Sequence, residues 1–308
     1  MAKVLVTGAS GLLGANLILE ALADHQVVGV YHQHGMVVQG AEIVSSDLAQ
    51  LGAARELLQT CQPDWVVHAA AATNMEACEV DAKMAFRLNC DMADLVAEAA
   101  RETGAGLIHI STDAVFDGQQ GNYLETDEPN PVSVYGESKW AGEQAVAKAH
   151  PDAAIVRTNF YGWNLQPKQS LAEMFLQVLE KEERCRGFTD VSFTTILVND
   201  LVRLILKMIE VGVSGTYHAG GGECISKYDF GIRLAETFEL DGSLIEPISV
   251  DQMNFKARRA KQLCMMGDRI ERQLGIELPS IEAGLRRFRG LRESGYAARL
   301  KEHSRRES

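Results

Sequence analysis

Residues 3–14 read KVLVTGASGLLG, and this stretch decides the fold. Lys3–Val6 is an apolar segment of strand length, and Leu12–Ala23 has the apolar period of a helix. The three glycines between them permit a tight turn, a close approach of the backbone to a pyrophosphate, and close packing of the helix on the strand. The N-terminus of the helix would meet the charge of the pyrophosphate. The stretch therefore predicts a dinucleotide-binding loop rather than an ordinary strand-to-helix turn, with contacts from Gly8, Ser10, Gly11, Leu12, Leu13 and Gly14.

Outward from this stretch, short apolar runs alternate with helical segments as far as Arg157. The segments are Gln26–Tyr31, Ala49–Gln59, Trp65–His68, Ala82–Thr103, Gly106–Ile110, Tyr135–His150 and Ala153–Arg157. Strands that are continuously apolar indicate burial on both faces, and their alternation with helices is typical of parallel sheets. The sequence predicts an α/β fold, a Rossmann-type doubly wound parallel sheet with a smaller C-terminal α/β lobe.

The regular alternation of short apolar runs and helical segments ends after Arg157, and the predicted domain boundaries follow from this change. We expect residues 1–160 to form the nucleotide-binding domain, completed by residues 190–222, and residues 161–189 and 223–308 to form the second lobe. Helices are expected near Leu171–Glu180, Asn199–Ile209 and Lys227–Phe238, and a charged helix at the C-terminal end. The sequence contains no low-complexity linker, so the lobe should pack directly on the first domain.

The composition argues against several classes of partner. The 308 residues are 46% hydrophobic and carry a formal net charge of −12. This charge opposes binding to nucleic acid and to anionic membranes, and no run reaches the ~18 apolar residues of a membrane span. The six cysteines form neither a C-x-x-C pair nor a zinc-ligand pattern, so we expect reduced thiols and no metal. The expected compartment is the cytoplasm.

The glycine spacing G-x-x-G-x-x-G resembles that of the extended short-chain dehydrogenase/reductase superfamily, which implies an NAD(P)-dependent oxidoreductase. NAD enzymes usually carry an acidic residue at the end of the second strand to hold the ribose. Tyr31 and His32 stand at that position here. Because no carboxylate would repel a 2′-phosphate, NADP(H) is the favoured cofactor and NAD(H) the second choice.

The same resemblance implies further cofactor contacts. Asp47 and Leu48 match the pair that contacts the adenine, and Ala69, Ala70 and Ala71 match the small residues beside the nicotinamide ribose. Asp47 also has a second interpretation, as the N-cap of the helix that follows it.

A Tyr-x-x-x-Lys pair stands downstream of a strand that ends in Ser-Thr. On a helix this spacing puts Tyr135 and Lys139 on one face, one turn apart. Reduction of a ketone needs a proton donor for the developing alkoxide, and a phenol whose pKa is lowered by an ammonium can supply it. We therefore expect Tyr135 to be the general acid/base and Lys139 to lower its pKa and to bind the nicotinamide ribose. Thr112 should polarise the substrate carbonyl.

Longer motifs narrow the resemblance. The segments STDAVFDG at 111–118 and VYGESKWAGE at 134–143 look like those of the dTDP-4-dehydrorhamnose reductase family. The resemblance implies NAD(P)H-dependent reduction of the 4-keto group of a dTDP-activated deoxysugar, with the C-terminal lobe binding this nucleotide sugar. Candidate substrate contacts are Ser111, Asn159, Trp163, Arg258 and Arg259, where Trp163 would either stack on a base or sugar or serve only in the packing of its lobe.

The chain departs from the family pattern in three places. Ala114 replaces the usual tyrosine, and prolines usual near Phe193–Thr195 and in the Lys256–Cys264 segment are missing. These positions concern the sugar pocket, so the reaction class is better determined than the sugar.

Three other functions share parts of this pattern. A 4,6-dehydratase resembles the same fold but places a glutamate where Ala114 stands, which disfavours dehydration. A 4-epimerase would use the same catalytic side chains with tightly held NAD. The regulatory β subunit of methionine adenosyltransferase also looks like this family and acts as a binding partner without turnover. A homodimer is expected from superfamily habit alone.

Overall fold

The core of the computed structural model, which describes residues 1–303, is one parallel sheet of seven strands. The strand order is β11-β6-β5-β4-β1-β2-β3. The strands are β1 (Lys3–Thr7), β2 (Gln26–Tyr31), β3 (Glu42–Ser45), β4 (Trp65–His68), β5 (Gly106–Thr112), β6 (Ala154–Thr158) and β11 (Gly215–His218). The winding direction reverses between β1 and β4, so the predicted doubly wound Rossmann-type sheet is confirmed.

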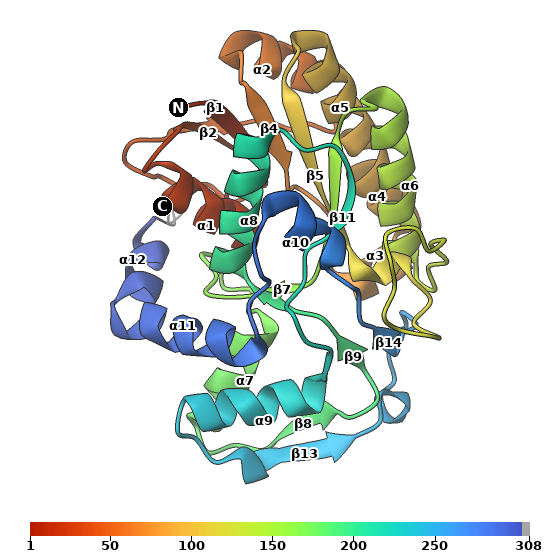
Figure 1. The fold of residues 1–308 in the computed structure, drawn as a ribbon, viewed down its shortest axis with the longest axis vertical. Helices are drawn as coiled ribbons and strands as arrows, with labels where there is room; N and C mark the ends of the chain where they lie inside the picture. The colour runs from red at the N-terminus through yellow and green to blue at the C-terminus, as the bar shows by residue number, and fades with distance from the viewer. Residues whose placement is uncertain (304–308) are drawn as a thin grey trace.

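Helices cover both faces of this sheet (Figure 1). Helices α1 (Leu12–Ala21) and α8 (Val198–Val211) pack together on one face, and α2 (Ala53–Cys61), α5 (Met92–Thr103) and α6 (Val134–Ala149) cover the other. Along β1, Val4 and Val6 join the core beneath the first face, whereas Leu5 joins the core beneath the second. Burial on both sides explains the unbroken apolar strands.

The predicted helix over Ala82–Thr103 is present but is interrupted. It consists of α4 (Ala82–Phe86), a π-helical segment at Arg87–Asp91 and α5. The short α3 (Met75–Val80) precedes it. The π segment directs Asn89 inward: its side chain accepts from the Ala72 amide at 2.7 Å and donates to the Ser138 hydroxyl at 3.0 Å.

The second part of the structure is built from small sheets of two or three strands rather than one large sheet. Strand β8 (Cys185–Phe188) pairs with β13 (Ile245–Ile248). Two-residue strands β12 (Ile225–Ser226) and β14 (Gln262–Leu263) flank β9 (Ser192–Phe193), and β7 (Phe160–Tyr161) pairs with β10 (Ile196–Leu197). Helices α7 (Leu171–Leu179) and α9 (Lys227–Thr237) lie where helices were predicted, as does α8.

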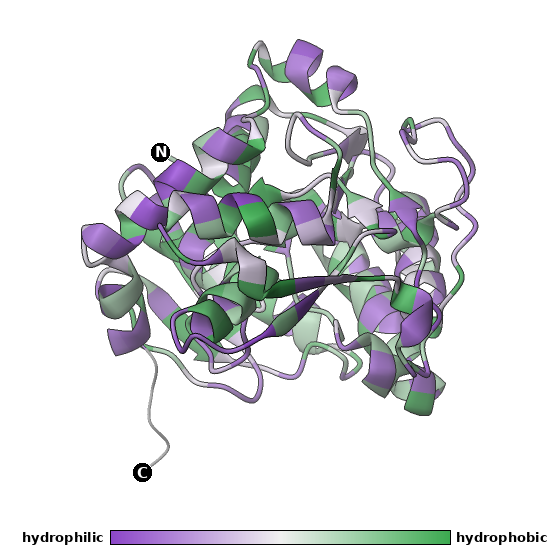
Figure 2. Cartoon of the chain, turned by 90° about the horizontal axis from the view of Figure 1, so that it is seen from below, coloured by the Kyte–Doolittle hydropathy of each residue, from purple (hydrophilic) through white to green (hydrophobic). Residues whose placement is uncertain are grey.

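The C-terminal segment returns to the first domain. Helix α10 (Asp268–Leu274) contacts β11 and α8, and α11 (Ile281–Glu293) contacts α9. In α12 (Tyr296–Glu302), the Tyr296 hydroxyl lies 2.8 Å from the side-chain oxygen of Asn16 on α1. The helices carry hydrophobic and hydrophilic stripes in Figure 2, as expected of helices that bury one face. The predicted C-terminal helix extends beyond residue 303, and that part lies outside the described residues.

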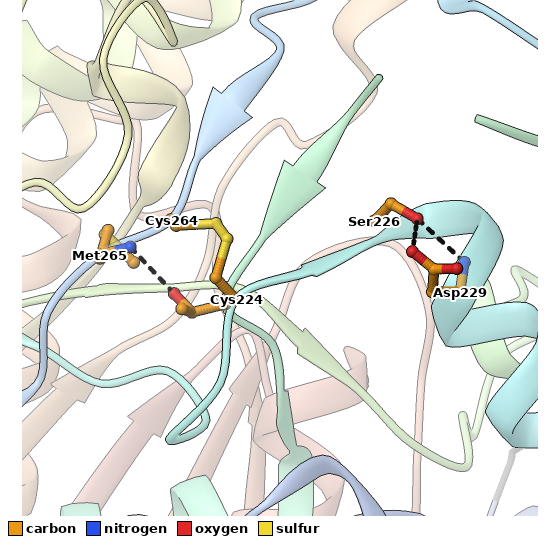
Figure 3. The surroundings of a disulfide bond; sticks show 6 residues. Cys224, Ser226, Asp229, Cys264 and Met265 are labelled. Atoms are coloured by element: carbon orange, nitrogen blue, oxygen red, sulfur yellow. Dashed lines mark hydrogen bonds between the residues drawn. A yellow bond between two sulfur atoms is a disulfide. The ribbon is translucent and has the colours of Figure 1, made fainter. Parts of the chain in front are cut away.

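The expectation that all cysteines are reduced is wrong for one pair. Cys224 and Cys264 form a disulfide across 40 residues of sequence (Figure 3), joining the segment before β12 to the segment after β14. Sequence spacing gave no sign of this pairing, because it depends on how β9 brings the two strands to its sides. The remaining cysteines, Cys61, Cys78, Cys90 and Cys185, are free.

Between residues 1 and 303, no helix is both long enough and apolar enough to cross a membrane.

Candidate active site

Two adjoining cavities open at the carboxyl ends of the sheet strands, where ligands bind in open α/β sheets. The larger has a volume of about 970 Å³ and runs from the glycine loop to Lys139. The smaller has a volume of about 480 Å³ and lies between the first domain and the second part of the chain. Thr112, Tyr135 and Asn159 line both cavities, so these residues form the boundary between the two.

The glycine loop forms one wall of the larger cavity. Gly8 has a φ of +67°, and a Cβ there would lie 2.9 Å from Cα of Ala70, so only glycine fits. A Cβ on Gly14 would lie 2.2 Å from the Gly8 carbonyl oxygen. Thr7 Oγ1 accepts from the amides of Ala69 and Ala70 at 3.1 Å each, which ties the end of β4 to the loop. Gly8, Ser10, Gly11, Leu12, Leu13, Gly14, Ala69, Ala70 and Ala71 all line this cavity, as the sequence suggested.

Four of the other residues that were predicted to contact the cofactor do not line the larger cavity. Gln33 and His34 line the larger cavity after β2, whereas Tyr31, His32, Asp47 and Leu48 are not among its lining residues. The interpretation of Asp47 as a helix cap is wrong, because α2 begins later and Gly52 is its N-cap. Asp47 instead accepts from the Ala49 amide at 3.2 Å and pairs with Arg87 at 3.5 Å.

The predicted catalytic side chains are brought together. Thr112 ends β5, and Tyr135 and Lys139 lie on consecutive turns at the start of α6, with Ser133 as the N-cap. Helix α6 approaches the end of β5 closely, because a Cβ on Gly136 would lie 2.2 Å from the Ala114 carbonyl oxygen. The Thr112 hydroxyl lies 3.0 Å from the Asp113 carboxylate. All three predicted side chains therefore reach the larger cavity.

Burial shifts both titratable groups. It raises the pKa of Tyr135 to about 12, and a hydrogen bond with Thr112 opposes this shift. The expected lowering of the phenol's pKa is therefore not seen in the chain by itself, because desolvation is the largest cause of the shift and Thr112, Asp113 and Cys78, rather than Lys139, supply the others. Burial also lowers the pKa of Lys139 to about 8, against the attraction of Glu143. Tyr135 thus keeps its proton at neutral pH.

The hydroxyl hydrogen of Ser111 is used in a hydrogen bond within the protein. It borders the larger cavity, but its hydroxyl donates to Glu143, which forms a buried ion pair with Arg157 at 2.8 Å. Because its O–H is used in this way, Ser111 could contact a substrate only as an acceptor, and that contact stays a prediction. Ser111 belongs to the support behind the site.

Four cationic side chains line the smaller cavity, and two of them were predicted from the sequence. Arg258 and Arg259 line it as predicted, and Lys168 and Lys227 line it as well. Arg259 pairs with Glu76 at 2.8 Å, whereas Arg258 is exposed at the cavity edge. Burial lowers the pKa of Lys227. Lys168 and Lys227 stand in no motif, so only the folded arrangement identifies them.

Asp113 is a second residue that the sequence did not single out. It is buried, and its carboxylate accepts from the Asn159 amide at 2.9 Å. Burial raises the pKa of Asp113 against these hydrogen bonds. Its position directly after Thr112 was the available signal. Asn159, which was predicted, is thereby fixed between the two cavities.

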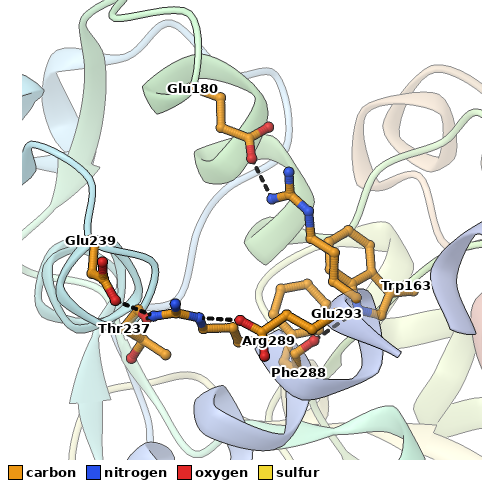
Figure 4. A network of polar contacts seen from close by, with 8 residues as sticks. Trp163, Glu180, Thr237, Glu239, Phe288, Arg289 and Glu293 are labelled. Atoms are coloured by element: carbon orange, nitrogen blue, oxygen red, sulfur yellow. Dashed lines mark hydrogen bonds and ion pairs between the residues drawn. The ribbon is translucent and has the colours of Figure 1, made fainter. Parts of the chain in front are cut away.

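Trp163 is not among the residues that line either cavity. It is packed beside Phe288 (Figure 4). Its indole N–H donates to the Phe288 carbonyl at 3.0 Å, and its ring stacks on Phe288 at 4.2 Å between centroids. Nearby, Arg289 joins α11 to Glu239 at 2.8 Å. Trp163 therefore packs within the protein, as the second interpretation had it, and this packing gives no support to stacking on a substrate ring.

Known proteins resemble this chain over nearly all of its length. A probable low-salt glycan biosynthesis reductase of Haloferax volcanii is 32% identical, over 91% of this chain and 95% of its own length. The methionine adenosyltransferase 2 subunit beta of Bos taurus is 29% identical, over 89% of this chain and 83% of its own. A crystal structure of dTDP-4-dehydrorhamnose reductase from Bacillus anthracis in complex with NADP is 28% identical, with a TM-score of 0.81 over 93% of this chain and 98% of its own.

The family model described as the RmlD substrate binding domain matches residues 2–290. This range includes the glycine loop, both cavities and the Tyr135–Lys139 pair. The chain therefore belongs to the RmlD substrate-binding-domain family of extended short-chain dehydrogenase/reductases.

Proposed function

We propose that this protein is an NADPH-dependent reductase that converts the 4-keto group of a dTDP-activated deoxyhexulose to the alcohol. The observation that carries the proposal is the position of Tyr135 and Thr112, which form part of the wall of both cavities. A group bound in one cavity would meet a group bound in the other at these two side chains. Family membership and the reductases among the relatives support the same reaction.

The larger cavity fits a dinucleotide. The N-terminus of α1 opens onto the glycine loop, and any side chain at Gly8 would fill the space beside Ala70. We infer that the residues from Gly8 to Gly14 hold the diphosphate, that Ala69–Ala71 lie against the nicotinamide ribose, and that Lys139 binds that ribose. When bound, the nicotinamide supplies the hydride. NADP is favoured because no carboxylate stands after β2 and because the Bacillus anthracis relative was crystallised with NADP.

The proton comes from this chain's own residues. Tyr135 is the general acid: its O–H donates to the substrate oxygen as negative charge develops there, and Thr112 donates a second hydrogen bond to that oxygen. The raised pKa of Tyr135, about 12, keeps the proton in place until the alkoxide forms. The Lys139 ammonium, with its third N–H free for the ribose, stabilises the phenolate that results.

The smaller cavity fits an anionic sugar nucleotide. Lys168, Lys227, Arg258 and Arg259 surround it in a chain whose net charge is −12. We infer that Arg258 and Arg259 meet the substrate diphosphate, because guanidinium groups match phosphate geometry. Asp113 and Asn159 would then face the sugar. Under this proposal residues 1–160 with 190–222 hold the cofactor, and residues 161–189 and 223–308 supply most of the substrate side.

The test is consumption of NADPH and of NADH at 340 nm with dTDP-4-keto-6-deoxyhexulose. Tyr135→Phe should lower kcat by about 10²- to 10⁴-fold while NADPH still binds. Tyr228→Phe, a half-buried tyrosine outside both cavities, is the matched control and should keep its activity. Tight NADPH binding by the wild type without turnover on this sugar or other keto-sugar nucleotides would contradict the proposal and favour a regulatory subunit. Cytoplasmic location and a homodimer belong to the same proposal, and gel filtration tests the latter.

A further inference from the structure

Two buried histidines lie directly beneath Lys139. His68 at the end of β4 and His109 in β5 are each 1% exposed, and their rings stack with centroids 5.3 Å apart. Lys139 Nζ is 2.7 Å from the Ile110 carbonyl oxygen and 3.4 Å from Nε2 of His109. Throughout residues 1–303, no carboxylate lies within ion-pair distance of this ammonium. Backbone and imidazole acceptors therefore replace a counter-ion.

The hydrogen bonds around Thr7 determine the protonation of His68. Thr7 Oγ1 accepts from the amides of Ala69 and Ala70, and a hydroxyl oxygen has two lone pairs. Its own hydrogen must then point to His68 Nδ1, which lies 2.8 Å away. Nδ1 of His68 is consequently an acceptor, and the ring carries its proton on Nε2. That Nε2 has no partner among the described residues.

The ammonium determines the protonation of His109 in the same way. Lys139 can only donate, so Nε2 of His109 must accept and the proton must sit on Nδ1. Nδ1 of His109 also lacks a partner among the described residues. A second proton on either ring would place a like charge beside Lys139. Burial opposes it too: it lowers the pKa of His68 to about 3 and that of His109 well below its usual value.

Groups from β4, β5 and its own helix α6 surround Lys139. His109 faces it from β5 and His68 stands behind it on β4, both neutral. On its own helix, Tyr135 lies one turn before it, and Glu143 one turn after it is held by Arg157. Two of the three N–H groups of Lys139 are therefore used by Ile110 and His109, and the third is left for the larger cavity, which Lys139 lines.

We propose that His109 is a positioning residue: its neutral Nδ1–H tautomer, set by the Lys139 ammonium and stacked on the neutral His68 ring, accepts from Lys139 and aims the remaining N–H of the ammonium into the larger cavity. The inference rests on the proposed function for its kinetic consequence, but the tautomer does not depend on turnover.

The first experiment detects the tautomers directly. Protein labelled with ¹⁵N in the histidine rings is titrated from pH 6 to 8.5 without cofactor, and the signal of His109 is the one lost in His109→Gln. We expect a protonated Nδ1 and an unprotonated Nε2 for His109, and the opposite tautomer for His68. His150→Gln, at the far end of α6, should remove a different signal. An imidazolium or an Nε2–H tautomer at His109 would overturn the proposal.

The second experiment measures kcat/KM against pH. His109→Leu removes the acceptor, and we expect kcat/KM to fall about tenfold and the alkaline limb to move down by about one pH unit, because the ammonium loses a stabilising partner. His109→Gln, which keeps an acceptor near the position of Nε2, should restore most of both effects, and His150→Gln should show neither. An unchanged pH profile in His109→Leu contradicts the inference while leaving the reductase intact. Absence of turnover in the wild type refutes the proposed function instead, and the tautomers still decide the inference.

Discussion

The two sides of the active site are built in different ways. The side with the glycine loop rests on seven strands in one continuous ladder. Thr112 ends β5 of this ladder, and Tyr135 and Lys139 lie on α6, which packs against β5. The side with Arg258 and Arg259 rests on short strands in separate small sheets. A disulfide links the segments beside β12 and β14 of one of these sheets, and Arg259 pairs with Glu76 on α3. A ladder fixes position through many shared hydrogen bonds, whereas isolated short strands depend on a few cross-links. We therefore expect damage to the first side to unfold the protein and damage to the second to weaken substrate binding.

The largest effect should come from the ion pair behind the sheet. Arg157 and Glu143 have side chains that are 4% and 2% exposed, and Arg157→Met leaves the Glu143 carboxylate buried without its cationic partner. We expect the free energy of unfolding to fall by about 3–5 kcal/mol, measured by urea denaturation. Arg55→Met, which breaks an exposed pair with Glu102, should cost about 1 kcal/mol or less. If both substitutions lowered the free energy of unfolding by the same amount, the proposed difference between the two sides of the site would be contradicted.

The disulfide tests the other side of the comparison. Cys224→Ser opens a cross-link over 40 residues, which should lower the free energy of unfolding by about 2–4 kcal/mol. Because Lys227 follows Cys224 and Arg259 precedes Cys264, we also expect KM for the sugar nucleotide to rise while Kd for NADPH stays constant. Cys185→Ser, at a free half-buried cysteine of β8, is the control. A rise in Kd for NADPH in the first variant would show that the two sides are not independent.

Acid should act on the seven-stranded sheet through two buried neutral histidines. Burial lowers the pKa of His68, at the end of β4, and of His218, at the end of β11, to about 3 each. Below pH ~6.5 the unfolded chain binds these protons and the folded chain does not, so stability falls as the pH drops toward 3. Each histidine contributes up to about 1.4 kcal/mol per pH unit. Urea midpoints at pH 7, 6 and 5 measure the slope, and His218→Gln should flatten it. A slope that stays the same in this variant contradicts the assignment.

The smallest effect is expected at the exposed edge of the smaller cavity. Arg258→Gln should raise KM for the sugar nucleotide by about threefold to tenfold, because one charge-assisted hydrogen bond at an exposed position is lost, and leave kcat close to the wild-type value. Arg184→Gln, an exposed arginine outside the cavity, should leave both constants unchanged. A loss of kcat in Arg258→Gln would mean that the diphosphate clamp also orients the keto group.

The contrast between the two sides also explains what the sequence could predict. Glycine-loop, strand and helix signals are local, so the loop at 8–14, the Tyr135–Lys139 turn and the helix near Lys227 could be located from a few neighbouring residues. The cysteine pair, the cation of Lys227 and the cavity position of Lys168 depend on segments far apart in the sequence that meet only in the folded chain.

The individual predictions that were wrong or left open also concern properties that no local stretch of sequence determines. Trp163 looked equally suited to stacking on a ligand and to packing, and only the contact with Phe288 on a distant helix shows the packing. Asp47 precedes a helical period, but the N-cap is Gly52, five residues later, and the helix begins at Ala53. The pKa of Tyr135 was expected to follow its charged neighbour, yet the degree of burial, which no local pattern records, has the greater influence.

The contacts of Asn89 depend on the exact number of residues in the π-helical segment at Arg87–Asp91. An extra residue in one turn of the helix is what lets Asn89 reach Ala72 on the cavity wall and Ser138 between the two catalytic positions. Deleting a single residue there would restore an ordinary α-helix and rotate α4 by about 100° relative to α5. Homologous chains that lack this residue would have to hold that wall in another way. Gaps in this helix, and not only in loops, would therefore divide members of the family that share one geometry of the site from those that do not.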